Sequence, residues 1–171
     1  MDILKKNFFD LFNIDIAVDI NKSELDEKVK ILQNKFHPDK YANGSDFEKR
    51  LALQISSHVN DGYKVLSDIV LRIDYILKIN NFVKDESKTI NDIEFLQEQI
   101  EYSELVETLK ENLNIVIIDE NLLKIKSLLK NTIDDIKLSL QSQDFEDMWQ
   151  KLSKIRFYIK NINELIIMRK K

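Results

Sequence analysis

The first 80 residues carry hydrophobic positions at helical spacing. A helix is predicted to begin near Asn21, and its apolar face comprises side chains at intervals of four and three: Leu25, Val29, Leu32 and Phe36. Pro38 ends this helix, because the residue before a proline is pushed out of the helical region. A second amphipathic pattern covers about 46–66 and a shorter one about 70–79. The first two helices are therefore predicted to pair antiparallel, with a loop at 37–45 between them.

Three more helical patterns fill the second half of the chain. They cover approximately residues 91–113, 120–142 and 145–169. Each carries an apolar stripe, and short polar breaks separate them, which is typical of a three-helix bundle. The polar run Lys84–Thr89 before them indicates a linker. We predict an all-α protein with an N-terminal domain, a linker and a C-terminal three-helix bundle at residues 1–80, 81–90 and 91–171.

Composition excludes several classes of protein and site. The 171 residues include two Gly, one Pro and no Cys, which is too few turn residues for an all-β chain. Gly44 and Gly62 are too far apart to form a phosphate-binding glycine loop. The lack of Cys excludes disulfides, thiolate metal sites and cysteine nucleophiles, and two His alone make a weak metal site. We therefore expect neither a metal nor a cofactor.

Charge and hydropathy narrow the range of partners. Lys and Arg number 26 against 30 Asp and Glu, a net charge of −4, so the concentrated basic face of a nucleic-acid binder is not expected. No uninterrupted apolar run exceeds four residues, so no membrane span is predicted. The N-terminal segment has the pattern of neither a signal peptide nor a transit peptide. The expectation is a cytoplasmic protein, monomeric by default.

The single proline stands in the predicted hairpin loop, where residues 37–40 read His-Pro-Asp-Lys. Taken alone, this run is also compatible with a purely structural turn. Lys28 and Lys35 are seven residues apart and so share one face of the preceding helix, beside its apolar stripe. A catalytic interpretation is poorer, because His37 and Asp39 are too close in sequence to define a dyad and no nucleophile is indicated.

With this context, residues 1–80 resemble the J-domain family, the co-chaperones of heat-shock ATPase chaperones. The run Phe-Phe-Asp-Leu-Phe at 8–12 is similar to the family's first helix, and Arg72 and Tyr75 have the spacing of its end. Gly62 departs from the Ala common there and is expected to loosen its helix by up to about 1 kcal/mol. The resemblance implies that the loop and the basic helix before it contact the chaperone and trigger ATP hydrolysis. The residues given this role are His37, Pro38, Asp39 and Lys40, with Lys28 and Lys35 steering the association.

The predicted helix at 91–113 also carries apolar side chains away from its core stripe. At 100° per residue, Leu96 and Ile100 lie well away from the centre of that stripe, toward an acidic face. This face includes Glu101 and Glu104. An apolar strip bordered by carboxylates is typical of a protein-binding surface.

The last predicted helix shows a similar feature at Phe157. This residue is two positions from the core residue Ile155, so it is expected to point away from the core and is a candidate binding hot spot. Periodicity alone leaves open the alternative that Phe157 and the strip pack on the N-terminal domain or the linker.

A J-domain followed directly by a three-helix bundle resembles the HscB family, co-chaperones of iron–sulfur cluster biogenesis. Residues 95–101 resemble the family's Phe-Leu-x-Glu-x-Leu-Glu run, and 154–157 resemble its Lys-Leu-Arg-Phe run. The resemblance implies that the bundle binds an IscU-like cluster scaffold protein. The residues that the resemblance implies for this contact, by their positions in the family's motifs, are Leu96, Ile100, Glu101, Glu104 and Phe157. The lack of Cys points to the bacterial form.

The function implied by this resemblance is that of a co-chaperone without catalytic residues or a cofactor. It would stimulate the ATPase of a dedicated HscA-like chaperone of the DnaK type and deliver the scaffold to it, which promotes cluster transfer. The alternative is a general J-domain adaptor whose C-terminal bundle binds a different client protein.

Overall fold

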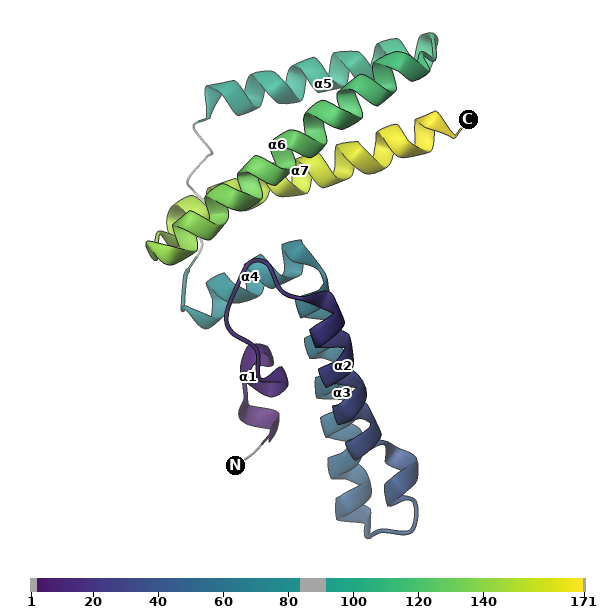
Figure 1. The fold of residues 1–171 in the computed structure, drawn as a ribbon, viewed down its shortest axis with the longest axis vertical. Coiled ribbons are helices and arrows are strands. Elements are labelled where there is room, and N and C mark those ends of the chain that lie inside the picture. Colours follow the sequence, from purple (N-terminus) through teal and green to yellow (C-terminus); the bar gives the residue numbers. More distant parts are fainter. Residues whose placement is uncertain (1–2, 84–91, 171) are drawn as a thin grey trace. The chain divides into compact units, whose positions relative to one another are not determined.

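The computed structural model of the chain describes residues 3–83 and 92–170. Within these ranges the backbone forms α-helices and two 3-10 helices, with no β-strand. The chain divides into two compact units, Met1–Asn81 and Phe82–Lys171, whose helices are labelled in Figure 1. Most of the predicted linker, residues 84–90, lies outside the described residues. The all-α class expected from the sequence is confirmed.

The N-terminal unit is built around a helical hairpin. Its elements are η1 (Ile3–Lys5), α1 (Phe8–Phe12), α2 (Lys22–Phe36), η2 (Pro38–Tyr41), α3 (Asp46–Ser67) and α4 (Ile69–Ile79). Helices α2 and α3 lie side by side, with η2 at the turn between them (Figure 1). Side chains fix where both begin: Asn21 Oδ1 accepts from the N–H groups of Ser23 and Glu24, and Ser45 forms a capping box with Glu48.

Helix α1 packs against α3 at Gly62. A Cβ at this position would lie only 2.9 Å from ring atoms of both Phe8 and Phe12. The glycine therefore admits two large rings that an alanine would displace. The expectation that Gly62 merely loosens α3 was incomplete, because the same residue makes the close packing of α1 possible.

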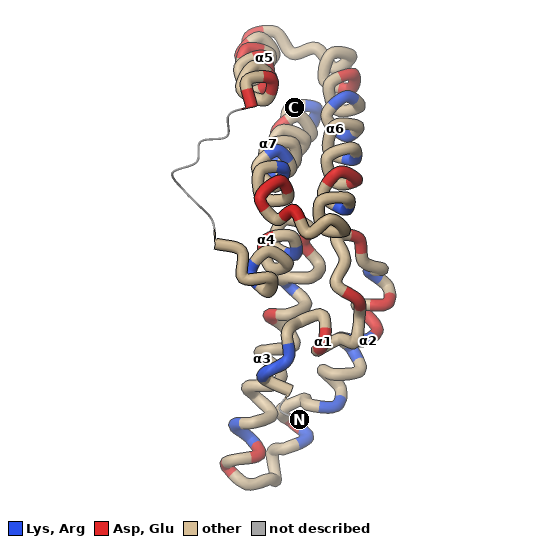
Figure 2. The backbone as a smooth tube through the Cα atoms, turned by 90° about the vertical axis from the view of Figure 1, so that its left-hand side faces the viewer, with Lys and Arg blue, Asp and Glu red and all other residues tan. Residues whose placement is uncertain are grey.

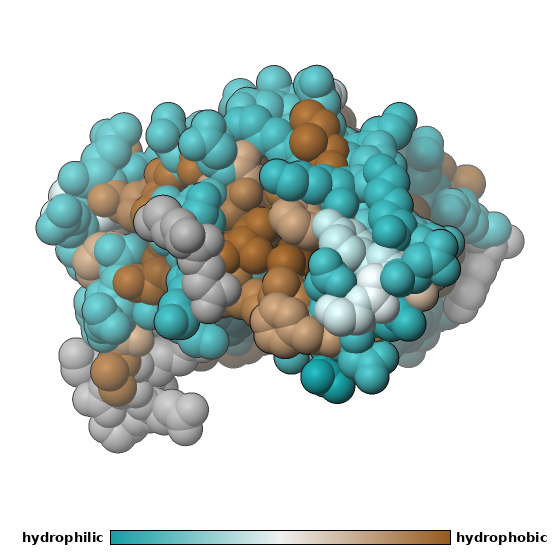
Figure 3. Space-filling view, turned by 90° about the horizontal axis from the view of Figure 1, so that it is seen from below, coloured by the Kyte–Doolittle hydropathy of each residue, from teal (hydrophilic) through white to brown (hydrophobic). Residues whose placement is uncertain are grey.

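Arg72 and Tyr75 connect α4 to the rest of this unit. Arg72 is 7% exposed, and its Nη1 donates to the carbonyl oxygen of Leu66 at 2.5 Å. The Tyr75 hydroxyl accepts from the backbone N–H of Phe8 at 3.0 Å, and its ring stacks on that of Phe8. Hydrophobic residues are visible between hydrophilic ones on the surface shown in Figure 3.

The C-terminal unit contains three helices, α5 (Ile93–Glu111), α6 (Ile115–Gln141) and α7 (Phe145–Arg169). Its core cluster comprises Val106, Leu109, Ile118, Leu122, Ile125, Tyr158, Leu165 and Met168. Helix α6 begins five residues before its predicted start at 120. The reason is Asn114, whose Oδ1 caps the first turn by accepting from the N–H groups of Val116 and Ile117.

Candidate functional sites

The His-Pro-Asp run lies in the predicted loop, and it forms a structured turn at the start of that loop. His37 has φ −60° and ψ 128°, the extended backbone expected of a residue before proline, and it ends α2. Pro38 then begins the 3-10 helix η2, where its fixed φ suits the first helical position. The N–H of Lys40 donates to the carbonyl oxygen of His37 at 3.0 Å, and that of Ala42 donates to Asp39 at 3.2 Å. The backbone of this turn is therefore held by its own hydrogen bonds.

The side chains of His37 and Asp39 play different parts in this turn. His37 Nδ1 accepts from the backbone N–H of Asp39 at 3.3 Å, so the imidazole caps η2. The Asp39 carboxylate lies 3.6 Å from the same nitrogen, and its side chain is 90% exposed. A fixed turn that presents a solvated carboxylate is suited to receive an arginine or lysine from a partner.

The basic residues near the turn are not equivalent. Lys35 and Lys40 are exposed, and the Lys35 ammonium lies 5.3 Å from the ring centroid of Phe36. Lys28 is half-buried: its Nζ donates to the carbonyl oxygen of Asn13 at 2.6 Å and pairs with Glu24 at 2.5 Å. The ammonium group of Lys28 thus stabilises the segment before α2, whereas Lys35 and Lys40 are accessible next to the turn.

A second candidate site lies on α5. Leu96 and Ile100 are 49% and 61% exposed, and they lie on α5 away from the face that carries Phe95 and Tyr102. Glu101 and Glu104 are exposed beside them. Figure 2 shows the concentration of acidic residues on α5 compared with α6 and α7.

Ile93 extends this strip by one turn and was absent from the predicted site. It is 80% exposed and lies three residues before Leu96, hence on the same side of α5. Its helical angle, close to those of Leu96 and Ile100, was visible in the sequence and could have placed it in the site. The exposed strip is defined here as Ile93, Leu96 and Ile100.

Phe157 does not share this exposed position. Its ring is half-buried and meets the rings of Phe95 and Tyr102 edge-on, with centroid distances of 5.4 and 5.8 Å. The expectation that Phe157 points away from the core was wrong. A helix in a three-helix bundle contacts two neighbours, so α7 buries two stripes, and Phe157 belongs to the one facing α5.

The Lys-Ile-Arg-Phe segment also positions the start of α5. Lys154 Nζ lies 2.5 Å from Asp92 Oδ2 and 5.3 Å from the ring centroid of Phe95. Asp92 caps α5, because its Oδ1 accepts from the Phe95 N–H at 2.9 Å. The hydrogen bond from Lys154, together with that from the Phe95 N–H, holds the pKa of Asp92 below its usual value.

Among the residues that the structure describes, no helix has both the length and the apolar composition that a membrane span requires.

Comparisons with known proteins identify the family. No family model matches the chain. A co-chaperone protein HscB homolog from Psychromonas ingrahamii is 30% identical over 166 residues, which cover 96% of this chain and 98% of the relative. An HscB homolog from Shewanella amazonensis is 40% identical over 102 residues, 59% of each chain.

A solved structure gives the same result at the level of the fold. Chaperone HscB from Vibrio cholerae superposes with a TM-score of 0.84 and 25% identity, covering 96% of this chain and 98% of that one. A helical hairpin with a His-Pro-Asp turn, followed by a three-helix bundle, defines a J-domain co-chaperone. The chain belongs to the HscB family of co-chaperones.

Proposed function

We propose that this protein stimulates the ATPase of an HscA-like chaperone through the His37–Lys40 turn. The observation that carries the proposal is the pairing of a fixed backbone with an exposed acid: His37 caps η2, while the Asp39 side chain is 90% exposed. Exposed Lys35 and Lys40 lie in sequence on either side of this carboxylate. An acidic patch on the chaperone's ATPase unit would attract them, and a basic side chain there would pair with Asp39.

We further propose that the C-terminal bundle binds an IscU-like iron–sulfur scaffold protein and delivers it to the chaperone. The exposed strip supplies an apolar contact, and Glu101 and Glu104 supply a polar rim. Phe157 supports this surface from inside, because it packs beneath α5 against Phe95 and Tyr102. Joining both ends in one chain raises the effective concentration of scaffold at the chaperone, which promotes cluster transfer.

The experiment that tests both ends measures ATP hydrolysis by the cognate chaperone with this protein present, with and without the scaffold. Stimulation by this protein, increased further by the scaffold, is expected. His37→Gln should abolish stimulation but leave scaffold binding by calorimetry unchanged. Stimulation that survives His37→Gln contradicts the role of the turn. Stimulation without any binding of the scaffold favours an adaptor for a different client protein.

A further inference from the structure

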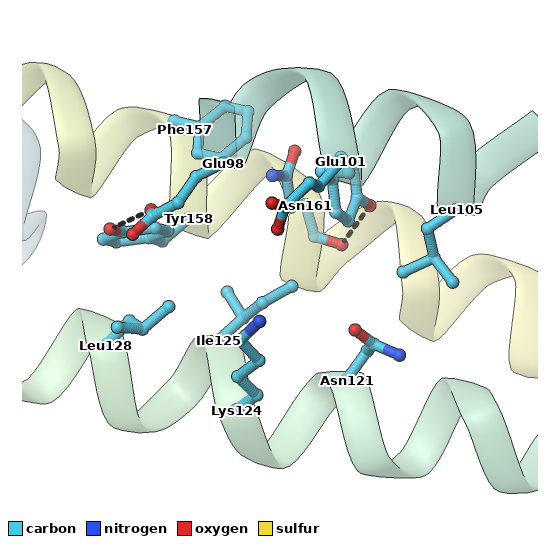
Figure 4. A pocket seen from close by; sticks show the side chains of 11 residues that line it. Glu98, Glu101, Leu105, Asn121, Lys124, Ile125, Leu128, Phe157, Tyr158 and Asn161 are labelled. Atoms are coloured by element: carbon cyan, nitrogen blue, oxygen red, sulfur yellow. Dashed lines mark hydrogen bonds between the residues drawn. The ribbon is translucent and has the colours of Figure 1, made fainter. Parts of the chain in front are cut away.

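The C-terminal bundle contains a pocket distinct from the exposed strip. Its volume is about 150 Å³, and α5, α6 and α7 all contribute to its walls (Figure 4). The strip lies on the opposite side of α5, since Leu96 and Ile100 are absent from the lining and point away from the core. A cavity of this size, where it is apolar, accommodates a single benzene ring.

The walls of the pocket are apolar on several sides. Leu105 comes from α5, Ile125 and Leu128 from α6, and Phe157 from α7. Figure 4 shows Leu105, Ile125 and Leu128 directed into the space between the three helices, with the Phe157 ring beside α5. They favour a ligand with a flat or compact apolar body of about the size of one ring.

One polar group in the pocket lacks a partner. Asn161 is 2% exposed, and its side-chain Nδ2 has no hydrogen-bond partner among the described residues. Its backbone carbonyl oxygen is engaged by the Tyr102 hydroxyl at 3.1 Å. A buried N–H group without a partner is unfavourable, so this position calls for a hydrogen-bond acceptor.

Carboxylates next to Asn161 restrict the ligand further. Glu98 and Glu101 line the same part of the pocket, while Lys124 lies across from them on α6 (Figure 4). The Tyr158 hydroxyl donates to Glu98 Oε2 at 2.8 Å, and burial together with this bond raises the pKa of Tyr158, which keeps the hydroxyl protonated. Two carboxylates disfavour an anion, and an ammonium or guanidinium group offers only donors, so it would leave the Asn161 Nδ2 without an acceptor.

We propose that this pocket binds a small neutral phenol, a ring-sized apolar molecule with one hydroxyl group. The hydroxyl oxygen accepts from Asn161 Nδ2, and the hydroxyl hydrogen is donated to one of the neighbouring carboxylates. The ring contacts the apolar walls. This proposal rests on the lining of the pocket and not on the functions proposed above, although Glu101 and Phe157 belong to both the pocket and the proposed scaffold-binding surface.

The test uses p-cresol as the probe and the full-length protein. Saturation-transfer NMR should detect binding with a dissociation constant on the order of 1 mM, as is usual for a ligand of this size. The side-chain amide resonances of Asn161 should shift on titration. Toluene, which lacks the hydroxyl, should bind roughly tenfold more weakly, and 4-methylbenzoate should not bind.

Two variants establish where the probe binds. Leu128→Phe fills the pocket and should abolish p-cresol binding. Leu123→Phe, at a 72% exposed residue of the same helix, should leave binding unchanged. Asn161→Leu removes the donor and should bring the affinities for p-cresol and toluene together. If Trp149 fluorescence shows that Leu128→Phe does not fold, the comparison of p-cresol with toluene in Asn161→Leu tests the proposed site instead. The proposal is overturned by undetectable binding at about 10 mM p-cresol, by equal affinity for p-cresol and toluene in the unchanged protein, or by binding that survives the filled pocket.

Discussion

Lys154 and Asp92 form an ion pair across the C-terminal bundle, with Nζ and Oδ2 2.5 Å apart. The pair joins α7 to the residue that caps α5, so it fixes the start of the helix that carries the exposed strip. Both side chains are about 30% exposed, which limits what the pair contributes to stability. The family's Lys-Leu-Arg-Phe motif therefore has a structural role here that precedes any contact with a partner.

The first prediction concerns the pH dependence of this pair. The pKa of Asp92 is lower in the folded than in the unfolded protein, so its contribution is complete above the unfolded value, near pH 4, and disappears as the pH falls through the folded value. Lys154→Met should lower the free energy of unfolding by about 0.5–1 kcal/mol at pH 7 and by much less near pH 2.5. Urea unfolding followed by Trp149 fluorescence reports on this unit, since Trp149 is the single tryptophan and lies in α7.

The matched control for Lys154→Met is Lys160→Met. Lys160 is an exposed lysine on the same helix and should change stability little at either pH. Equal destabilisation by Lys154→Met at both pH values would show that packing of the lysine stem on Phe95, rather than the charge pair, stabilises the start of α5.

The second prediction concerns Gly62. In an unobstructed helix interior, Gly→Ala is stabilising by about 0.5–1 kcal/mol. In α3 the added methyl group would meet the rings of Phe8 and Phe12 at 2.9 Å, so Gly62→Ala should instead destabilise the N-terminal unit by roughly 1–3 kcal/mol. Hydrogen exchange of the α3 amides measures this, with Ser57→Ala on the exposed side of the same helix as the control. The double variant Gly62→Ala/Phe12→Leu should recover part of the loss.

The third prediction separates Lys35 from Lys28 in chaperone stimulation. Lys35→Ala should increase the concentration needed for half-maximal ATPase stimulation several-fold, more at low than at high salt, because an exposed cation steers association. Lys28→Ala should have a smaller effect on stimulation and a larger effect on thermal stability, because its ammonium already pairs with Asn13 and Glu24. Lys126→Ala on α6 serves as a charge-matched control. A greater loss of stimulation in Lys28→Ala than in Lys35→Ala would reverse this assignment.

The fourth prediction distinguishes the exposed strip from Phe157. Leu96→Ala/Ile100→Ala should change the free energy of unfolding of the bundle by less than about 1 kcal/mol and weaken scaffold binding at least about tenfold. Phe157→Ala should cost about 2–4 kcal/mol of stability, because a half-buried ring that contacts Phe95 and Tyr102 is lost. Calorimetry and Trp149 fluorescence provide the two readouts, and Leu123→Ala is the exposed control. Unchanged scaffold affinity in the double variant would leave the strip without its proposed role.

Local sequence chemistry determined most of the elements of this protein. The 3.6-residue period placed the helices, and Asn21, Ser45 and Pro38 marked ends of α2 and α3, because caps and proline act on the backbone within a few residues. The position of Leu96 and Ile100 away from the core stripe of α5 also followed from the pattern, whereas their exposure did not.

Only the tertiary structure decided the features that depend on neighbours distant in the sequence. The apolar period of α7 could not show that Phe157 packs on α5, because one helix reveals its stripes but not how many neighbours cover them. Gly62 appeared to be a weak point until Phe8 and Phe12 were placed against it. Lys28 and Lys35 looked equivalent on their helix, yet a backbone carbonyl from residue 13 engages only the first. Periodicity describes one element at a time, whereas burial and pairing are properties of the space between elements.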